Sequence, residues 1–163
     1  MLTKIEKAYI AGFLDGDGCI MFQLVRRKDY IFGYQVRASA VFYQKTINRR
    51  QLEWLKTKLR HGYLRDRNDG MTEYTIVGIE AVKEVLKKLQ PFIRLKKQHV
   101  KLAFKIFGKL PKRFTTQSLI AVGKLVDGFK KLNYSKKRQN TSQTLKDFFS
   151  SNRLVMIPRN DFF

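Results

Sequence analysis

The sequence predicts an α+β domain in which four antiparallel strands lie beneath a layer of helices. Two observations favour this fold class. The spacing of apolar residues changes twice from a helical period to strict alternation, and each alternating stretch is long enough to form a hairpin. Beyond residue 96 the spacing remains helical to the end of the chain. The predicted order is therefore αββαββα, followed by extra C-terminal helices.

The first helix is predicted from the period of its aromatic and aliphatic residues. Ile5, Tyr9 and Phe13 recur every four residues, and we expect Tyr9 and Phe13 to enter the core of the protomer. The helix is expected to end near Asp15. Small residues form a stripe beside this face: Ala8, Ala11 and Gly12.

Two hairpins follow from the alternating stretches. In residues 19–25 and 32–43 one face is apolar and the other carries polar and basic side chains. Residues 63–67 and 73–77 form the second hairpin around the turn sequence Asn-Asp-Gly.

The remaining elements are helical in pattern. A helix over residues 47–60 separates the hairpins and points Leu52, Leu55 and Leu59 inward. A third helix ends at Pro91, which cannot continue the hydrogen-bond pattern. We expect a last short helix near residues 145–149.

The charge balance predicts a polyanionic partner. The chain has 34 basic and 13 acidic residues, a formal net charge of +21, which makes nucleic acid the first candidate. Eleven basic residues and no acidic one lie between residues 85 and 126. The single cysteine, Cys19, excludes an internal disulfide and a cysteine-based zinc site. Neither a signal peptide nor a membrane span is expected.

The open face of the sheet is the predicted DNA-contacting surface. Arginine suits guanine edges, glutamine suits adenine, and a two-stranded ribbon fits the major groove. The alternative is an ordinary solvated sheet face, which we regard as less favoured because arginines on long strands without acidic cross-strand partners are unusual. The residues predicted to contact DNA from this face and its loop are Met21, Gln23, Val25, Arg27, Tyr30, Gln35, Arg37, Ser39, Val41, Arg65, Arg67, Glu73 and Thr75.

The junction between the first helix and the first strand concentrates carboxylates in a basic chain. Asp17 follows the electronegative end of a helix, between Gly16 and Gly18. A carboxylate and a backbone carbonyl are hard oxygen ligands that suit Mg²⁺, which can bridge them to phosphate. The alternative is a helix end with an acidic turn, where Asp15 and Asp17 bind only local amides.

Four blocks of sequence carry a resemblance to a known family. They are "YIAGFLDGDG" from Tyr9, "YQKT" from Tyr43, "HGYLRDR" from His61 and "LQPFIRLKKQ" from Leu89. Together they resemble the LAGLIDADG homing endonucleases, in particular the small, single-motif, homodimeric members encoded in group I introns of algal chloroplasts. The resemblance covers nearly the whole chain.

The resemblance implies the homing-endonuclease fold, with a four-stranded saddle on double-stranded DNA. It implies a single domain over residues 1–163, with a core to about 134 and a DNA-contacting segment over about 135–163. Two chains would pair through their motif helices, and the small residues Ala8, Ala11 and Gly12 are the predicted interface. Neither a membrane nor a small-molecule substrate is implied. The implied location is an organelle, the chloroplast or else the mitochondrion.

The resemblance also assigns site residues. Asp17 and the carbonyl of Gly16 would bind two or three Mg²⁺ ions per dimer, with Mn²⁺ as a substitute, while Asp15 would be structural. Gln44 and Lys96 would organise water and phosphate. Asn48 stands where close relatives carry a basic residue, so Arg49 is the expected replacement. The predicted phosphate-contacting residues of the C-terminal segment are Lys136, Lys137 and Arg138.

The predicted function is a site-specific homing endonuclease. It would make a double-strand break in a long, near-palindromic target by metal-dependent hydrolysis and so promote intron homing. Two alternatives stay open. One is an RNA-binding intron maturase without nuclease activity, and the other is a structural protein that coats nucleic acid.

Overall fold

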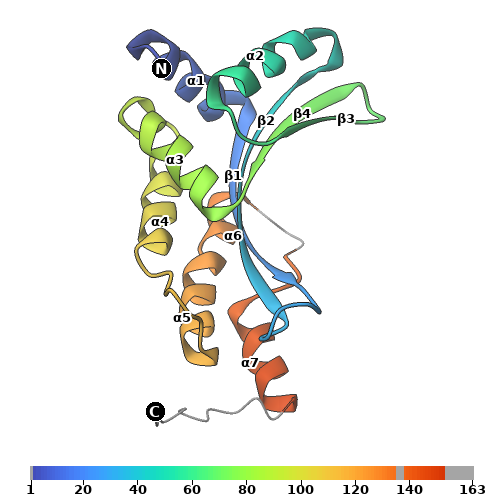
Figure 1. The fold of residues 1–163 in the computed structure, drawn as a ribbon, viewed down its shortest axis with the longest axis vertical. Coiled ribbons are helices and arrows are strands. Elements are labelled where there is room, and N and C mark those ends of the chain that lie inside the picture. The colour runs from blue at the N-terminus through green and yellow to red at the C-terminus, as the bar shows by residue number, and fades with distance from the viewer. Residues whose placement is uncertain (1, 135–137, 153–163) are drawn as a thin grey trace.

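Four antiparallel strands form a curved sheet in the order β1-β2-β4-β3 (Figure 1). The computed structural model describes residues 2–134 and 138–152. β1 and β2 form a long hairpin that extends well beyond the short pair β3 and β4. The strands are β1 (Gly18–Arg26), β2 (Tyr34–Lys45), β3 (Tyr63–Asp66) and β4 (Met71–Val77).

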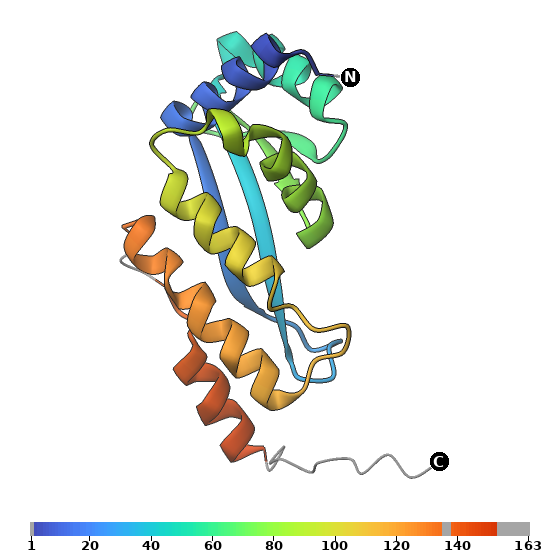
Figure 2. The same ribbon diagram turned by 90° about the vertical axis from the view of Figure 1, so that its left-hand side faces the viewer.

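The helices lie mainly on one face of the sheet, and Figure 2 shows α3, α4 and α5 following one another in front of the long hairpin. The predicted order αββαββα and the extra C-terminal helices are confirmed. The helices are α1 (Lys4–Asp17), α2 (Arg49–Leu59), α3 (Ile79–Leu89), α4 (Lys97–Phe107), α5 (Thr116–Asp127), α6 (Phe129–Leu132) and α7 (Ser142–Ser151), with 3₁₀ turns at Thr46–Asn48 and Gln90–Phe92.

The core lies between the sheet and the helical layer. Ile20, Phe22 and Leu24 alternate inward along β1, as predicted, and are at most 3% exposed. Phe22 lies 5.0 Å from Phe129 and 5.4 Å from Phe107, measured between ring centroids. These aromatic contacts fix the long hairpin against α4 and α6.

The buried face of α1 differs from the predicted one. Ile10, Ala11 and Leu14 are fully buried, whereas Ile5 is 82% and Tyr9 is 51% exposed. The prediction that Tyr9 belongs to the core is therefore wrong, because the inward stripe follows the other residues of the motif. The prediction that Ala11 contacts a partner chain is also wrong, because the protomer itself covers Ala11 completely.

Local signals define the ends of α1. Thr3 and Glu6 form a reciprocal capping box at its start. The helix continues to Asp17, two residues beyond its predicted end, and β1 begins at the next residue. Asp17 is thus the last residue of the helix. No helix in residues 2–134 or 138–152 has the length and hydropathy needed to cross a membrane.

Two glycines in the β3–β4 region provide a matched test of backbone packing. Gly62 and Gly70 have φ of +75° and +77°, where a side chain costs about 1 kcal/mol. A Cβ on Gly62 would also lie 2.2 Å from the carbonyl oxygen of Thr75, whereas a Cβ on Gly70 would meet no described atom within 4 Å. We expect Gly62→Ala to lower the free energy of unfolding by about 3 kcal/mol or more and Gly70→Ala by about 1 kcal/mol in urea denaturation. Equal losses would contradict the packing at Gly62.

Candidate metal and nucleic-acid site

The site is built around the buried carboxylate of Asp15, which is 8% exposed. Its Oδ2 accepts hydrogen bonds from the backbone N–H groups of Arg94 and Leu95 at 2.6 and 3.0 Å. Its Oδ1 accepts from the backbone N–H of Lys96 at 2.9 Å. Three donors from the loop before α4 therefore converge on one side chain of α1, which agrees with the structural role implied for Asp15.

The side chain of Lys96 completes this connection. Its ammonium donates to the backbone carbonyl of Asp15 with an Nζ–O distance of 2.5 Å. That carbonyl belongs to the last turn of α1, where carbonyls lack intrahelical partners and the helix dipole is negative. Because α1 has no basic residue in its own last turn, Lys96 supplies the balancing charge from another element.

Asp17 differs from Asp15 in almost every respect. It is exposed, and its carboxylate makes no hydrogen bond or ion pair with the described part of the chain. Gly16 beside it is exposed as well. A free carboxylate next to the carbonyl-rich end of a helix matches the oxygen donors that Mg²⁺ prefers. Within the described ranges no three His, Cys, Asp or Glu side chains come together in a way that could hold a metal ion.

The polar residues at the end of β2 divide into two groups. The side-chain oxygen of Gln44 accepts from the side-chain amide of Asn48 at 3.2 Å, which joins the end of β2 to the 3₁₀ turn before α2. Arg49 instead bonds to Asp66 at 3.2 Å and forms an ion pair with Glu53. The guanidinium of Arg49 is therefore already committed to two carboxylates, and the structure does not support its expected catalytic role.

The open face of the sheet has an exposed rim and a covered centre. Gln23, Arg65 and Arg67 are exposed. Ser39 and Val41 are 3% exposed and Thr75 is 6% exposed, although they point away from the core. Their neighbours cover them, so the prediction that these three contact DNA is not supported by the structure. The partly exposed members of the face are Met21, Val25, Gln35, Arg37 and Glu73.

Acidic partners accompany several arginines, contrary to the argument from the sequence. Arg65 pairs with Glu73 directly across β3 and β4 at 2.9 Å. In the loop between β1 and β2, Arg27 bonds to Asp29 at 2.6 Å and lowers the pKa of that carboxyl to about 2. Arg27 also lies 5.4 Å from the ring of Tyr30. Such exposed pairs orient the guanidinium groups but stabilise the fold only weakly.

The predicted phosphate contact at Arg138 is wrong. Its side chain is 10% exposed and turned into the protein. Its guanidinium donates to the carbonyl of Phe22 in β1 and to the carbonyl of Val126 in α5, both at 2.6 Å. Lys136 and Lys137, predicted for the same role, lie outside the described residues.

Asn133 is a structural polar residue that the sequence did not identify. Its side-chain amide donates to the carbonyl of Ile20 at 2.9 Å, and its side-chain oxygen lies 3.0 Å from Nε2 of His99. No local motif marks this asparagine, since its partners are 113 and 34 residues away.

The two motif aspartates yield a paired prediction for stability. In Asp15→Asn one oxygen becomes an NH₂ group that faces a backbone N–H, so at least one buried donor loses its acceptor. We expect this variant to lose about 2 to 4 kcal/mol of unfolding free energy in urea denaturation. Asp17→Asn should change it by no more than about 0.5 kcal/mol, because its carboxylate has no partner in the described chain. A stable Asp15→Asn protein would contradict the anchoring role.

Comparison with known proteins agrees with these features. Residues 10–109 match the model of the LAGLIDADG endonuclease family. The chain is 36% identical to the DNA endonuclease I-CvuI of Chlorella vulgaris over 144 residues, or 88% of this chain and 89% of that protein. It is 35% identical to the DNA endonuclease I-CreI of Chlamydomonas reinhardtii over 155 residues, or 93% and 94% of the two chains.

The fold comparison leads to the same family. A crystal structure of I-CvuI in complex with its target, in the presence of calcium, superposes with a TM-score of 0.86. The match covers 94% of this chain and 96% of that one at 35% identity. The archaeal homing endonuclease I-Vdi141I shares the fold with a TM-score of 0.78 at 18% identity, over 92% of this chain and 98% of that one. The fold, the motif with its buried and free aspartates, and these similarities show that the chain belongs to the LAGLIDADG endonuclease family.

Proposed function

We propose that two copies of this chain form a site-specific homing endonuclease that cuts both strands of a near-palindromic DNA target with the help of Mg²⁺. The observation that carries this proposal is the difference between the two aspartates of the motif. The carboxylate of Asp15 accepts hydrogen bonds from three backbone amides. Asp17, two residues away, is exposed and has no partner within the described chain. A carboxylate kept free in a chain of net charge +21 suits a cation that in turn meets phosphate.

The residues near Asp17 have distinct proposed roles. Asp17 and the carbonyl of Gly16 would hold the metal, which when bound activates water and stabilises the leaving oxygen. Gln44, whose side-chain oxygen is oriented by Asn48, would position the attacking water. Lys96 holds the end of α1 through the carbonyl of Asp15. Its charge would therefore lie near a phosphate that a metal on Asp17 and Gly16 would bind.

The exposed side of α1 supports pairing of two chains. Ala8, Gly12 and Gly16 are spaced four residues apart and are all exposed. A Cβ on Gly12 or on Gly16 would meet nothing within 4 Å in residues 2–134 and 138–152, so packing within these parts of the protomer does not require the two glycines. Each costs the helix about 1 kcal/mol relative to alanine. We explain Gly12 and Gly16 by the close approach of a second α1, which their lack of a side chain would permit. This approach would bring two Asp17 side chains together across a two-fold axis.

The open face of the sheet would read the target. Gln23, Arg37 and the partnered Arg65 present donors and acceptors for base edges from three strands. The lysines of the helices would add sequence-independent, salt-dependent attraction. Because the relatives from Chlorella vulgaris and Chlamydomonas reinhardtii are algal proteins, we assign this protein to an organelle, most simply the chloroplast, where cutting an intronless gene copy would promote intron homing.

Replacement of Asp17 tests the metal role directly. A cognate duplex would first be selected by cleavage from a library of near-palindromic targets carried on supercoiled plasmids. We expect Asp17→Asn to lower the cleavage rate at least a thousandfold while target binding in Ca²⁺ stays within about threefold. Asp147→Asn, an exposed carboxylate on α7, is the charge-matched control and should cut normally. Cleavage that persists in EDTA would refute the proposal, and RNA binding without DNA cleavage would favour the maturase alternative.

Replacement of Gly12 tests the helix pair. Gly12→Leu removes a helix-breaking residue from an open position, so the protomer should remain folded. The bulky side chain should keep the two α1 helices apart, giving a monomer in sedimentation equilibrium and no double-strand cleavage. Ala121→Leu places the same side chain on the exposed face of α5 and should stay dimeric and active. A dimeric, active Gly12→Leu protein would show that α1 is not the interface.

A further inference from the structure

The strand that carries Met21, Gln23 and Val25 lies at the edge of the sheet. In the order β1-β2-β4-β3, β1 pairs only with β2 among the residues that the structure describes. The backbone groups of alternate β1 residues must therefore point outward. An unpaired row of N–H and C=O groups can pair with a strand of another molecule. Ile20 and Phe22 have their side chains in the core and their carbonyls on this outer edge.

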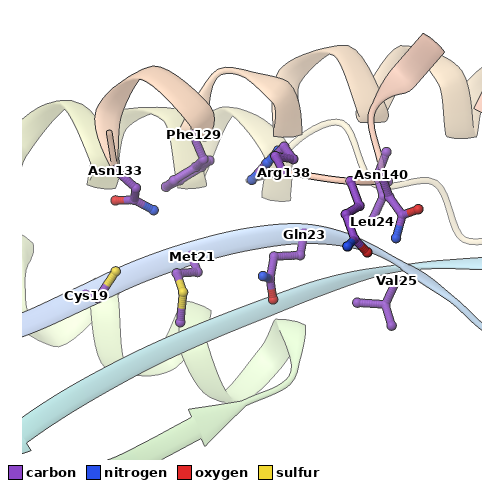
Figure 3. Close-up of a pocket in the computed structure, with 10 residues that line it drawn as sticks. Cys19, Met21, Gln23, Leu24, Val25, Phe129, Asn133, Arg138 and Asn140 are labelled. Carbon is purple, nitrogen blue, oxygen red and sulfur yellow. The ribbon is translucent and has the colours of Figure 1, made fainter. Parts of the chain in front are cut away.

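Both of these carbonyls accept hydrogen bonds from side chains that follow α6. Asn133 donates to Ile20 at 2.9 Å, and Arg138 donates to Phe22 at 2.6 Å. The two acceptors are two residues apart on one strand, about 7 Å along it. The chain after α6 is thus attached to the outer edge of β1 at two successive positions. Figure 3 shows Asn133 and Arg138 between the ribbon of β1 and the helices, with Met21 and Gln23 on the other side of the strand.

The guanidinium of Arg138 also contacts the end of α5 and, through Asp127, is connected to the start of α7. It donates to the carbonyl of Val126 at the end of α5 at 2.6 Å and lies 3.8 Å from the carboxylate of Asp127. The other oxygen of Asp127 accepts from the backbone N–H of Ser142, the first residue of α7. Burial lowers the pKa of Arg138, while Asp127 acts in the opposite direction. A side chain committed in this way cannot reach a phosphate.

The residues next to Arg138 line a groove shared with the open face. The groove has a volume of about 440 Å³. Its lining combines the amides of Gln23, Asn133, Gln139 and Asn140 with the side chains of Met21 and Val25. Asparagine and glutamine amides suit base edges, notably adenine, better than they suit phosphate. Apart from the buried Arg138, no basic side chain lines this groove in the described part of the protein.

We propose that Arg138 is a positioning residue for DNA recognition: it fixes the segment after α6 to the edge of β1, so that Gln139 and Asn140 extend the base-reading surface of Gln23 beyond the sheet. This inference rests on the proposed function, since it names further residues that read the same DNA. Arg138 acts through Gln139 and Asn140 without contacting the target.

Replacement of Arg138 separates positioning from direct phosphate contact. Arg138→Met keeps the length of the side chain and loses the hydrogen bonds to both carbonyls. We expect about a tenfold loss of affinity for the selected target in Ca²⁺, the equivalent of one base contact, and weaker discrimination against base changes at the positions nearest Gln23. The slope of log affinity against log salt should be unchanged, because a lost phosphate contact would reduce it by about 0.9. A reduced slope, or unchanged affinity and discrimination, would overturn the inference.

Two further variants test whether Arg138 acts through Gln139 and Asn140 or through general stability. Gln139→Ala combined with Asn140→Ala should reproduce the lost discrimination without a large change in melting temperature, and adding Arg138→Met should lower the affinity little further. Leu59→Ala, a core change in α2, should lower the melting temperature but keep discrimination intact. Equal loss of discrimination in Leu59→Ala would overturn the inference. If the wild-type protein neither binds nor cuts any selected DNA, the proposed function itself fails.

Discussion

The three amides that converge on the carboxylate of Asp15 are the contact on which the rest of the structure depends. They join the end of α1 to the loop before α4, across about 80 residues of sequence. A carboxylate that accepts three backbone hydrogen bonds holds its helix end in one position. The exposed Asp17 follows two residues later, so the hydrogen bonds of Asp15 also determine where Asp17 lies. The motif thus separates the residue that fixes geometry from the residue that is free to bind.

The long hairpin depends on a similar arrangement along its length. Its inner side is held by aromatic contacts of Phe22 with α4 and α6, and its outer edge by Asn133 and Arg138. The open face between these supports contains few deeply buried polar groups, Ser39 and Thr75 among them. The backbone that carries the recognition surface is thus held by contacts on its inner side and on its outer edge, which suits a protein that must distinguish one DNA sequence from another.

The sequence predicted the order of elements, both hairpins and the inward faces of β1 and α2, because alternation and helical periods reflect burial directly. It failed where one helix offered two possible inward faces: in α1 Tyr9 was expected in the core, yet Tyr9 is half exposed and Ile10, Ala11 and Leu14 are buried. It also failed for Arg49 and Arg138, since a basic residue near a motif looks the same whether it faces phosphate or a distant carboxylate or carbonyl. The partners of Arg138 are 12 and 116 residues away, a separation that no local pattern reveals.

The occupied edge of β1 has a consequence for assembly. An edge strand with free carbonyls invites a strand from a neighbouring molecule, the first step toward continuous sheets and aggregation. Here the carbonyls of Ile20 and Phe22 already have donors from the same chain, and the opposite edge, β3, is only four residues long and carries Arg65 and Asp66. Sheet extension is thus discouraged at both ends, which leaves helical surfaces as the natural meeting place for two copies.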